Sequence, residues 1–181
     1  MPVPQMALAR GRVHEVAGPA RRTLAALAAG MAGGEGPVLW LQPGWASEGL
    51  CAQGLRPLVA DPGALILARA TTTLDLLWAA EEALRAGSVA LVIAALPEPP
   101  DLRQIRRLHL AAEDGLTRNR RAGPAPLGLV YAQDSAAGRC PGVESRWALH
   151  PLPAGGWRLD RLLARGQPPA DWTLTTLPRP A

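Results

Sequence analysis

Apolar residues along the chain fall into two patterns. Short continuous runs of strand length are typical of strands buried on both faces in a parallel sheet. Longer segments repeat apolar residues three and four positions apart, which is typical of helices. Together they predict strands at 12–17, 37–42, 64–69, 89–96 and 127–131, helices at 22–31, 71–86 and 101–114, and a short helix near 47–54.

Local signals mark the ends of the two best helices. The threonines at 71–73 are candidate N-caps and Gly87 is a candidate stop, while Asp101 is placed to cap the helix that follows. In the helix at 71–86, Leu74, Leu77, Trp78, Glu81 and Leu84 recur at helical spacing. We therefore assign Trp78 to the core, together with Trp40 of the strand at 37–42.

The alternation of strands and helices up to residue 131 predicts right-handed βαβ units. Beyond it, three stretches separated by turns are expected to be antiparallel strands, at 144–152, 157–165 and 172–177. The expected fold is therefore α/β, a mostly parallel central sheet flanked by helices with antiparallel strands at its C-terminal end. We expect one domain at 11–177, a flexible leader at 1–10 and a flexible tail at 178–181.

Composition removes several kinds of chemistry. All 19 basic residues are arginine, so a lysine Schiff base and a P-loop lysine are both excluded. The two cysteines and three histidines are scattered and match no metal-ligand spacing, and no paired carboxylates or nucleophile motifs stand out. No apolar run reaches the length of a membrane span. We expect a cytoplasmic protein without a cofactor.

A series of motifs then suggests a family. GRVHEVAGP at 11–19 is similar to the way RecA-like cores approach their P-loop, and the order of strands and helices after it also matches. The chain resembles the ImuA family, RecA-like accessory proteins of bacterial mutagenic repair cassettes. The resemblance covers about residues 10 to 177 and rests on further motifs in order: PVLWLQ, LWAAEEALRAG, IRRLHLAAE, SRWAL, WRLDRLLARG and DWTL.

The residues at the expected P-loop depart from the pattern of an ATPase. A P-loop needs a second glycine and a lysine before its Ser/Thr, and both are missing here. In addition, Ala94 stands where RecA-like ATPases carry an acidic residue that organises magnesium. The sequence therefore predicts no ATPase activity. The vestigial loop comprises Gly18, Pro19, Arg21, Arg22 and Thr23.

Two groups of side chains remain as candidates for binding a partner protein or DNA. The arginines are Arg103, Arg106, Arg107, Arg118, Arg120 and Arg121, and the tryptophans are Trp45, Trp157 and Trp172. Clustered arginines suit phosphates or an acidic protein surface, although a solvated helix face followed by a basic loop is the simpler explanation. No aromatic residues interleave with them to stack bases, which weakens a single-stranded DNA site.

The resemblance implies a non-catalytic accessory protein of SOS-linked translesion DNA synthesis. Its implied partners are an ImuB-like inactive relative of the Y-family polymerases, RecA, and an error-prone C-family DNA polymerase. An alternative is a division inhibitor like SulA, of the same broad superfamily. A third is a RecA-like protein that retains nucleotide or DNA binding.

Overall fold

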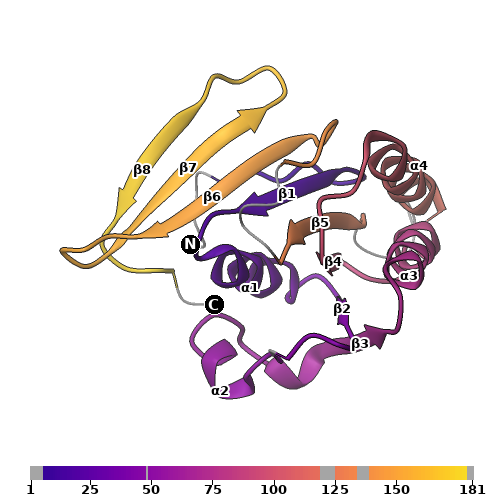
Figure 1. The fold of residues 1–181 in the computed structure, drawn as a ribbon, viewed down its shortest axis with the longest axis horizontal. Helices are drawn as coiled ribbons and strands as arrows, with labels where there is room; N and C mark the ends of the chain where they lie inside the picture. Colours follow the sequence, from indigo (N-terminus) through magenta and orange to yellow (C-terminus); the bar gives the residue numbers. More distant parts are fainter. Residues whose placement is uncertain (1–5, 48, 119–124, 134–138, 179–181) are drawn as a thin grey trace.

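The computed structural model describes residues 6–47, 49–118, 125–133 and 139–178 (Figure 1). The described part of the chain forms strands, α-helices and one 3-10 turn in the order β1 (Val13–Ala17), α1 (Arg21–Ala32), β2 (Val38–Pro43), α2 (Ala52–Leu55), η1 (Pro62–Ala64), β3 (Leu65–Ala70), α3 (Thr73–Ala86), β4 (Leu91–Leu96), α4 (Leu102–Arg118), β5 (Leu127–Ala132), β6 (Ser145–Pro151), β7 (Trp157–Ala164) and β8 (Ala170–Leu174).

The strands form one sheet of eight, in the order β3-β2-β4-β5-β1-β6-β7-β8. The six strands from β3 to β6 in that order are parallel to one another. Strand β7 is antiparallel to both β6 and β8. The expected α/β class, with a mostly parallel sheet and antiparallel C-terminal strands, is confirmed. One detail was wrong: β6 was expected to be purely antiparallel, but it continues the parallel sheet by pairing with β1.

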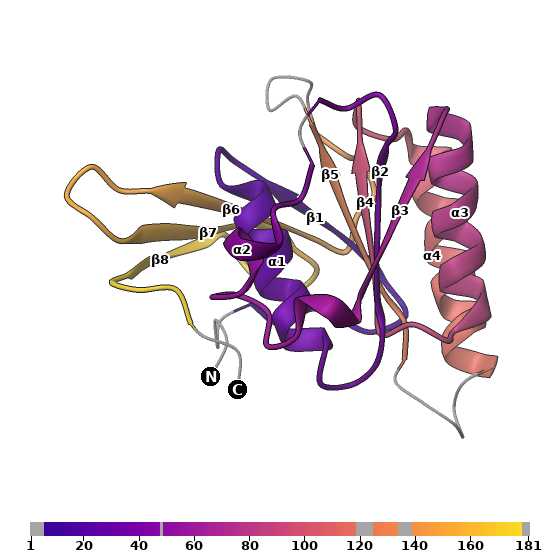
Figure 2. The same ribbon diagram turned by 90° about the horizontal axis from the view of Figure 1, so that it is seen from below.

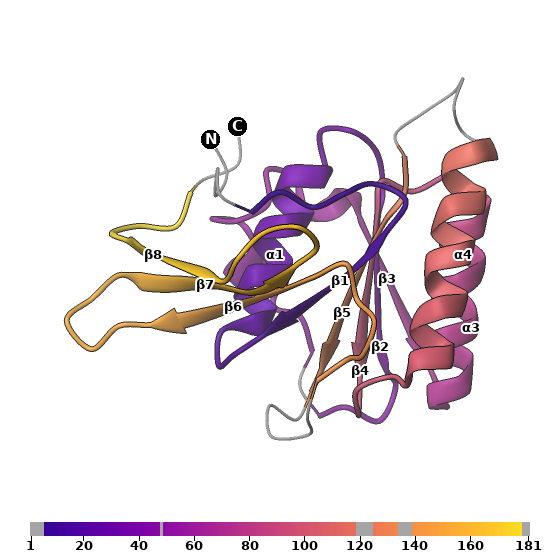
Figure 3. The ribbon, with the colours of Figure 1, turned by 90° about the horizontal axis from the view of Figure 1, so that it is seen from above.

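Helices cover both faces of the parallel part of the sheet. Helix α1 lies on one face, and α3 and α4 lie side by side on the other (Figures 2 and 3). The side chains of β4 alternate between the two resulting cores, so that Ile93 and Ala95 join the α1 core while Val92 and Ala94 join the α3/α4 core. Strands β4 and β5 are buried on both faces, as continuous apolar runs predict.

Side-chain caps begin the two long helices. The Thr72 hydroxyl accepts from the Asp75 N–H, and Gly87 ends α3 in the left-handed conformation with φ of 66°. At the start of α4, Asp101 and Gln104 each accept a hydrogen bond from the other's backbone N–H at 2.8 Å. The caps expected from the sequence are confirmed, while α4 runs four residues past the expected end at 114 and takes up the start of the expected loop at 115–126.

Strand β3 corrects a second expectation. Its apolar run predicted a strand buried on both faces, but β3 is the edge strand of the sheet. Ile66 and Leu67 are consequently 50% and 45% exposed. Edge position depends on the strand order, which the apolar run itself does not contain.

The expected leader also differs from the structure where it is described. Met6 is buried in the α1 core, and the Arg10 guanidinium donates to the Ala90 carbonyl oxygen at 2.9 Å. Residues 6–10 thus pack onto the domain expected to begin at residue 11. No helix in the described ranges combines the length and apolar character needed to cross a membrane.

Candidate functional site

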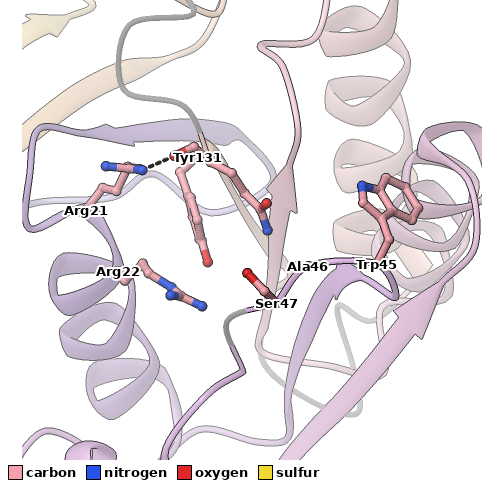
Figure 4. A pocket seen from close by; sticks show the side chains of 7 residues that line it. Arg21, Arg22, Trp45, Ala46, Ser47 and Tyr131 are labelled. Atoms are coloured by element: carbon pink, nitrogen blue, oxygen red, sulfur yellow. Dashed lines mark hydrogen bonds between the residues drawn. The ribbon is translucent and has the colours of Figure 1, made fainter.

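A cavity of about 420 Å³ lies where the carboxyl ends of β1, β2 and β5 meet (Figure 4). In open α/β sheets this edge is where ligands bind. One wall is formed by the first turn of α1, a second by the segment after β2, and a third by the end of β5. The lining residues are Arg21, Arg22, Trp45, Ala46, Ser47, Tyr131 and Gln133. The vestigial loop and Trp45 are therefore brought together, as neighbours of one cavity.

The connection from β1 to α1 is a tight turn that requires glycine. Gly18 has a φ of 83°, and a Cβ atom there would lie 2.9 Å from the Leu149 carbonyl oxygen of β6. The Gly18 carbonyl in turn accepts from the Arg21 N–H at 3.3 Å, which closes the turn. The chain thus enters α1 close against β6, without a wide loop around the cavity.

The backbone donors of this turn are committed to the protein itself. Pro19 has no N–H, the Ala20 N–H donates to the Leu149 carbonyl oxygen at 3.1 Å, and the Arg21 N–H donates to Gly18. A P-loop holds phosphate by turning consecutive N–H groups toward it. The two N–H groups between Pro19 and Arg22 are therefore not available for that role.

The Arg21 side chain is also committed. Its Nε donates to the Ala132 carbonyl oxygen at 2.8 Å, and its terminal nitrogens donate to the carbonyl oxygens of Gly18, at 3.2 Å, and Gln133. Figure 4 shows this guanidinium turned toward the end of β5. The positive charge is thus satisfied by carbonyl dipoles at the site where a P-loop would hold an anion.

Arg22 of α1 and Tyr131 of β5 also line the cavity (Figure 4). The Tyr131 ring meets Trp40 edge to face, with ring centroids 6.4 Å apart. Burial raises the pKa of Tyr131 above its ordinary value, and the charges of Arg22 and Arg21 oppose that shift only in part. Thr23, the expected hydroxyl of the vestigial loop, is half-buried in the first turn of α1. The described residues that line this cavity offer hydrogen-bonding groups, and none of them carries a carboxylate.

The position expected to correspond to the acidic residue of RecA-like ATPases is occupied by a buried alanine. Ala94 is buried against the α3/α4 core, on the face of β4 opposite α1, whereas Ala95 faces the α1 side. The matching position remains a prediction, since it rests on the resemblance. Both candidates are alanine, so neither supplies a metal ligand. No group of three or more His, Cys, Asp or Glu able to hold a metal occurs within the described ranges.

A buried polar cluster crosses from β1 to β6 and was not anticipated from the sequence. Glu15 and Arg146 are paired in the sheet register, and Arg146 Nε lies 2.5 Å from Glu15 Oε2. The Cys140 N–H donates to the same carboxylate at 3.2 Å, and Arg146 donates to the Cys140 carbonyl oxygen at 2.8 Å. Burial raises the pKa of the Cys140 thiol far above its ordinary value, so this thiol is not a nucleophile.

The candidate arginines lie on the other side of the sheet from the cavity. Arg103, Arg106 and Arg107 are exposed on α4 and line a shallow hollow of about 650 Å³. Arg118 is exposed in the last turn of α4, and Arg120 and Arg121 lie outside the described residues. The arginines and the vestigial loop therefore do not form one site.

Two of the three candidate tryptophans pack against the protein. Trp157 and Trp172 are half-buried beside the α1 core. Trp172 stacks on the buried Trp147 with centroids 5.9 Å apart, and Arg161 lies over both rings. Trp45, in contrast, is 53% exposed at the mouth of the cavity. Of these three, Trp45 is the one most open to a partner.

A third hollow, between α3 and α4, corrects the assignment of Trp78. Trp40 is fully buried as expected, but Trp78 is 61% exposed and Leu74, one turn earlier in α3, is 71% exposed. The buried face of α3 is formed by Leu76, Leu77, Ala80, Glu81 and Leu84, so Leu76 and Ala80 take the places expected for Leu74 and Trp78. A tryptophan within reach of an arginine-rich helix was the signal in the sequence that could have marked this surface.

Comparison with solved structures finds similar folds, whereas no protein-family model matches the chain and no curated protein matches its sequence. A crystal structure of SulA from Pseudomonas aeruginosa is similar over 66% of this chain and 96% of its own length, with 19% sequence identity and a TM-score of 0.47. Similarity at this level does not assign a function.

Proposed function

We propose that this chain is a non-catalytic RecA-like accessory protein that acts by binding other proteins in a translesion DNA synthesis complex. The observation that carries the proposal is the internal use of Arg21. In place of a phosphate, its guanidinium is bonded to the carbonyl oxygens of Gly18, Ala132 and Gln133. A guanidinium that already donates to three backbone carbonyl oxygens is poorly placed to bind a triphosphate.

Three further features support the absence of nucleotide chemistry. The backbone N–H groups of Ala20 and Arg21 are bonded to Leu149 and Gly18, so the phosphate cradle is missing. The chain has no lysine to neutralise a γ-phosphate. The strand that carries the acidic residue in RecA-like ATPases has alanine at both candidate positions, Ala94 and Ala95. Each feature removes a different requirement of the reaction.

The fold and the surface support a binding role. A sheet of eight strands with helices on both faces is a rigid scaffold. Its surface carries exposed tryptophans at 45 and 78 and exposed arginines on α4, the residue types enriched at the centres of protein interfaces. The resemblance to ImuA gives the expected partners: an ImuB-like inactive polymerase relative, with RecA and an error-prone C-family polymerase in the same assembly.

A binding assay with purified proteins tests this proposal. The tagged full chain is mixed with the ImuB-like protein of the same organism, and in a parallel arm with the tubulin-like division protein. We expect the ImuB-like protein to co-elute in size-exclusion chromatography and the division protein not to. A stable complex with the division protein alone, together with inhibition of its assembly, would contradict the proposal and favour the SulA-like alternative.

A further inference from the structure

The hollow between α3 and α4 is an apolar groove open to solvent. It has a volume of about 250 Å³ and is lined by Leu74, Asp75, Leu77, Trp78, Glu81, Gln104, Arg107 and Leu108. Leu77 and Leu108 are buried in its floor, whereas Leu74 and Trp78 stand exposed along its α3 side. We call this surface the α3–α4 groove.

The groove exists because apolar side chains cover a wider arc of α3 than the arc that packs against the sheet and α4. Leu76, Ala80 and Leu84 are buried against the sheet and α4. Leu74 and Trp78, one turn apart, lie outside that arc. Both side chains are exposed to solvent, although they adjoin the floor of the groove. An exposed tryptophan beside a buried leucine is typical of a binding surface.

Two glutamates beside the groove form ion pairs within the helix pair. Glu81 lies 2.5 Å from a nitrogen of Arg85 and 2.7 Å from a nitrogen of Arg107, and Glu82 pairs with Arg85 as well. The Asp75 carboxylate accepts from the Thr72 hydroxyl at 2.7 Å, in the cap of α3. Of the two carboxylates that line the groove, Glu81 is thus paired with arginines, whereas Asp75 keeps its charge in the first turn of α3, where the helix dipole favours it.

Positive charge is available next to the groove. Arg107 lines both the groove and the hollow that contains Arg103 and Arg106, so the two surfaces are continuous. In that hollow, Arg12 pairs with Glu113 and Arg165 lies 3.7 Å from Glu144. Within the part of the chain that the structure describes, Arg103 and Arg106 have no carboxylate within ion-pair distance.

We propose that the α3–α4 groove, with Arg103 and Arg106, binds an acidic amphipathic helix of a partner protein. Apolar side chains of that helix cover Leu74 and Trp78, and its carboxylates pair with the two arginines. The inference rests on the proposed function, since it names the surface and the chemistry through which the chain binds. A groove between two adjacent helices suits a third helix. A nucleic acid would use the arginines but leave Leu74 and Trp78 in water.

Fluorescence polarisation with two labelled synthetic helices tests the chemistry. Both peptides have about 18 residues, long enough for helix formation, with the same leucine stripe. Glutamate fills the polar face of one, and lysine that of the other. The purified full chain should bind the glutamate peptide at least about tenfold more tightly than the lysine peptide, with an affinity that falls as salt is added.

Matched variants locate the site. Trp78→Ser and the double variant Arg103→Glu/Arg106→Glu should each weaken binding of the glutamate peptide by about tenfold or more. Leu162→Ser on β7 and Arg56→Glu at the end of α2 remove an exposed leucine and an exposed arginine elsewhere, and should bind like the unaltered chain. Since all these positions are exposed, each variant should unfold at the same urea midpoint as the unaltered chain, which shows that it is folded.

Several outcomes overturn the inference. They are equal affinity for the two peptides, no binding of either, or an equal loss in the control variants. Binding of a single-stranded oligonucleotide that needs the arginines but not Trp78 would assign the surface to nucleic acid. Dimerisation in sedimentation that Trp78→Ser abolishes would assign the groove to a second copy of the chain.

The same variants separate this inference from the proposed function. If the ImuB-like protein binds the unaltered chain and both groove variants equally well, the groove is not the docking site, but the accessory role stands. If it does not bind the unaltered chain at all, the proposed function fails, whatever the peptides do.

Discussion

The Nε–H of Arg21 donates a hydrogen bond to the carbonyl oxygen of Ala132, over a distance of 2.8 Å. The contact joins the first residue of α1 to the last residue of β5, across the edge of the sheet where α/β proteins bind ligands. The same guanidinium holds Gly18 and Gln133. A side chain of the expected vestigial loop thus acts as a structural tie.

This tie predicts a clear loss of stability on removal. Arg21→Ala removes the side-chain hydrogen bonds to three carbonyl oxygens, of which Gly18 keeps its bond from the backbone N–H of residue 21. It should lower the free energy of unfolding by about 2 kcal/mol, as expected for hydrogen bonds to a charged group. Urea denaturation measures the change. Arg56→Ala, an exposed arginine at the end of α2, is the matched control and should change stability by less than about 0.5 kcal/mol. Equal effects of the two changes would contradict the role given to Arg21.

The buried pair of Glu15 and Arg146 predicts strong coupling. Glu15→Leu or Arg146→Met alone leaves an unpaired buried charge and should cost about 3 to 5 kcal/mol. The double variant should cost less than the sum of the two by at least about 2 kcal/mol, because no charge then remains unpaired. A double-mutant cycle in urea measures this coupling.

A less buried pair on β7 provides the control for that cycle. Arg158 and Asp160 lie 3.1 Å apart, with the arginine side chain half exposed. Their coupling should stay below about 1 kcal/mol. Additive costs at Glu15 and Arg146 would mean that the two charges do not depend on one another.

His14 predicts a loss of stability in weak acid. Burial lowers its pKa from 6.5 to about 4. The neutral ring fits its surroundings, since Nδ1 lies 2.7 Å from the Ser145 hydroxyl and Nε2 lies 3.0 Å from the Ala9 carbonyl oxygen. Between pH 6.5 and pH 4 the unfolded chain binds the proton that the folded chain does not, so stability falls as the pH falls through this window.

The expected loss attributable to His14 is about 2 kcal/mol between pH 7 and pH 5. It is measured as the difference in urea unfolding free energy between the two pH values. His14→Asn should remove most of this slope, whereas His150→Gln, at a half-buried position near the end of β6, should keep it. An unchanged slope in His14→Asn would show that other groups carry the acid sensitivity.

Local chemistry explains which parts of the fold could be predicted from the sequence. The caps at Thr72, Gly87 and Asp101 were correct, because a cap depends on a few adjacent residues. The buried strands β4 and β5 were correct because a strand covered by helices on both faces needs a continuous apolar run. Such signals are complete within a short window of sequence.

The errors arise where the answer depends on distant parts of the chain. Helical spacing alone does not choose between two overlapping apolar arcs of α3. For this reason Trp78 was assigned to the core, whereas in the structure Leu76 and Ala80 lie in the core and Trp78 is exposed. Likewise, the apolar run around Ile66 is equally suited to a central strand and an edge strand. The order of strands in the sheet decides between them.

The candidate site was predictable only as a set of missing residues. The absent lysine and the short turn at Gly18 are visible in the sequence. The bonding of Arg21 to Ala132, 111 positions away, and the pairing of Glu15 with Arg146 are set by strand order and register. No local pattern contains those contacts, so the structural roles of both arginines were missed.

Isothermal titration calorimetry with ATP and magnesium tests the central claim most directly, namely that the nucleotide-binding position is closed by the protein's own backbone. The account predicts no heat of binding at micromolar ATP, with or without magnesium, for the full chain. Saturable, magnesium-dependent binding in the micromolar range would contradict it, because Arg21 and the turn at Gly18 would then have to release their backbone partners.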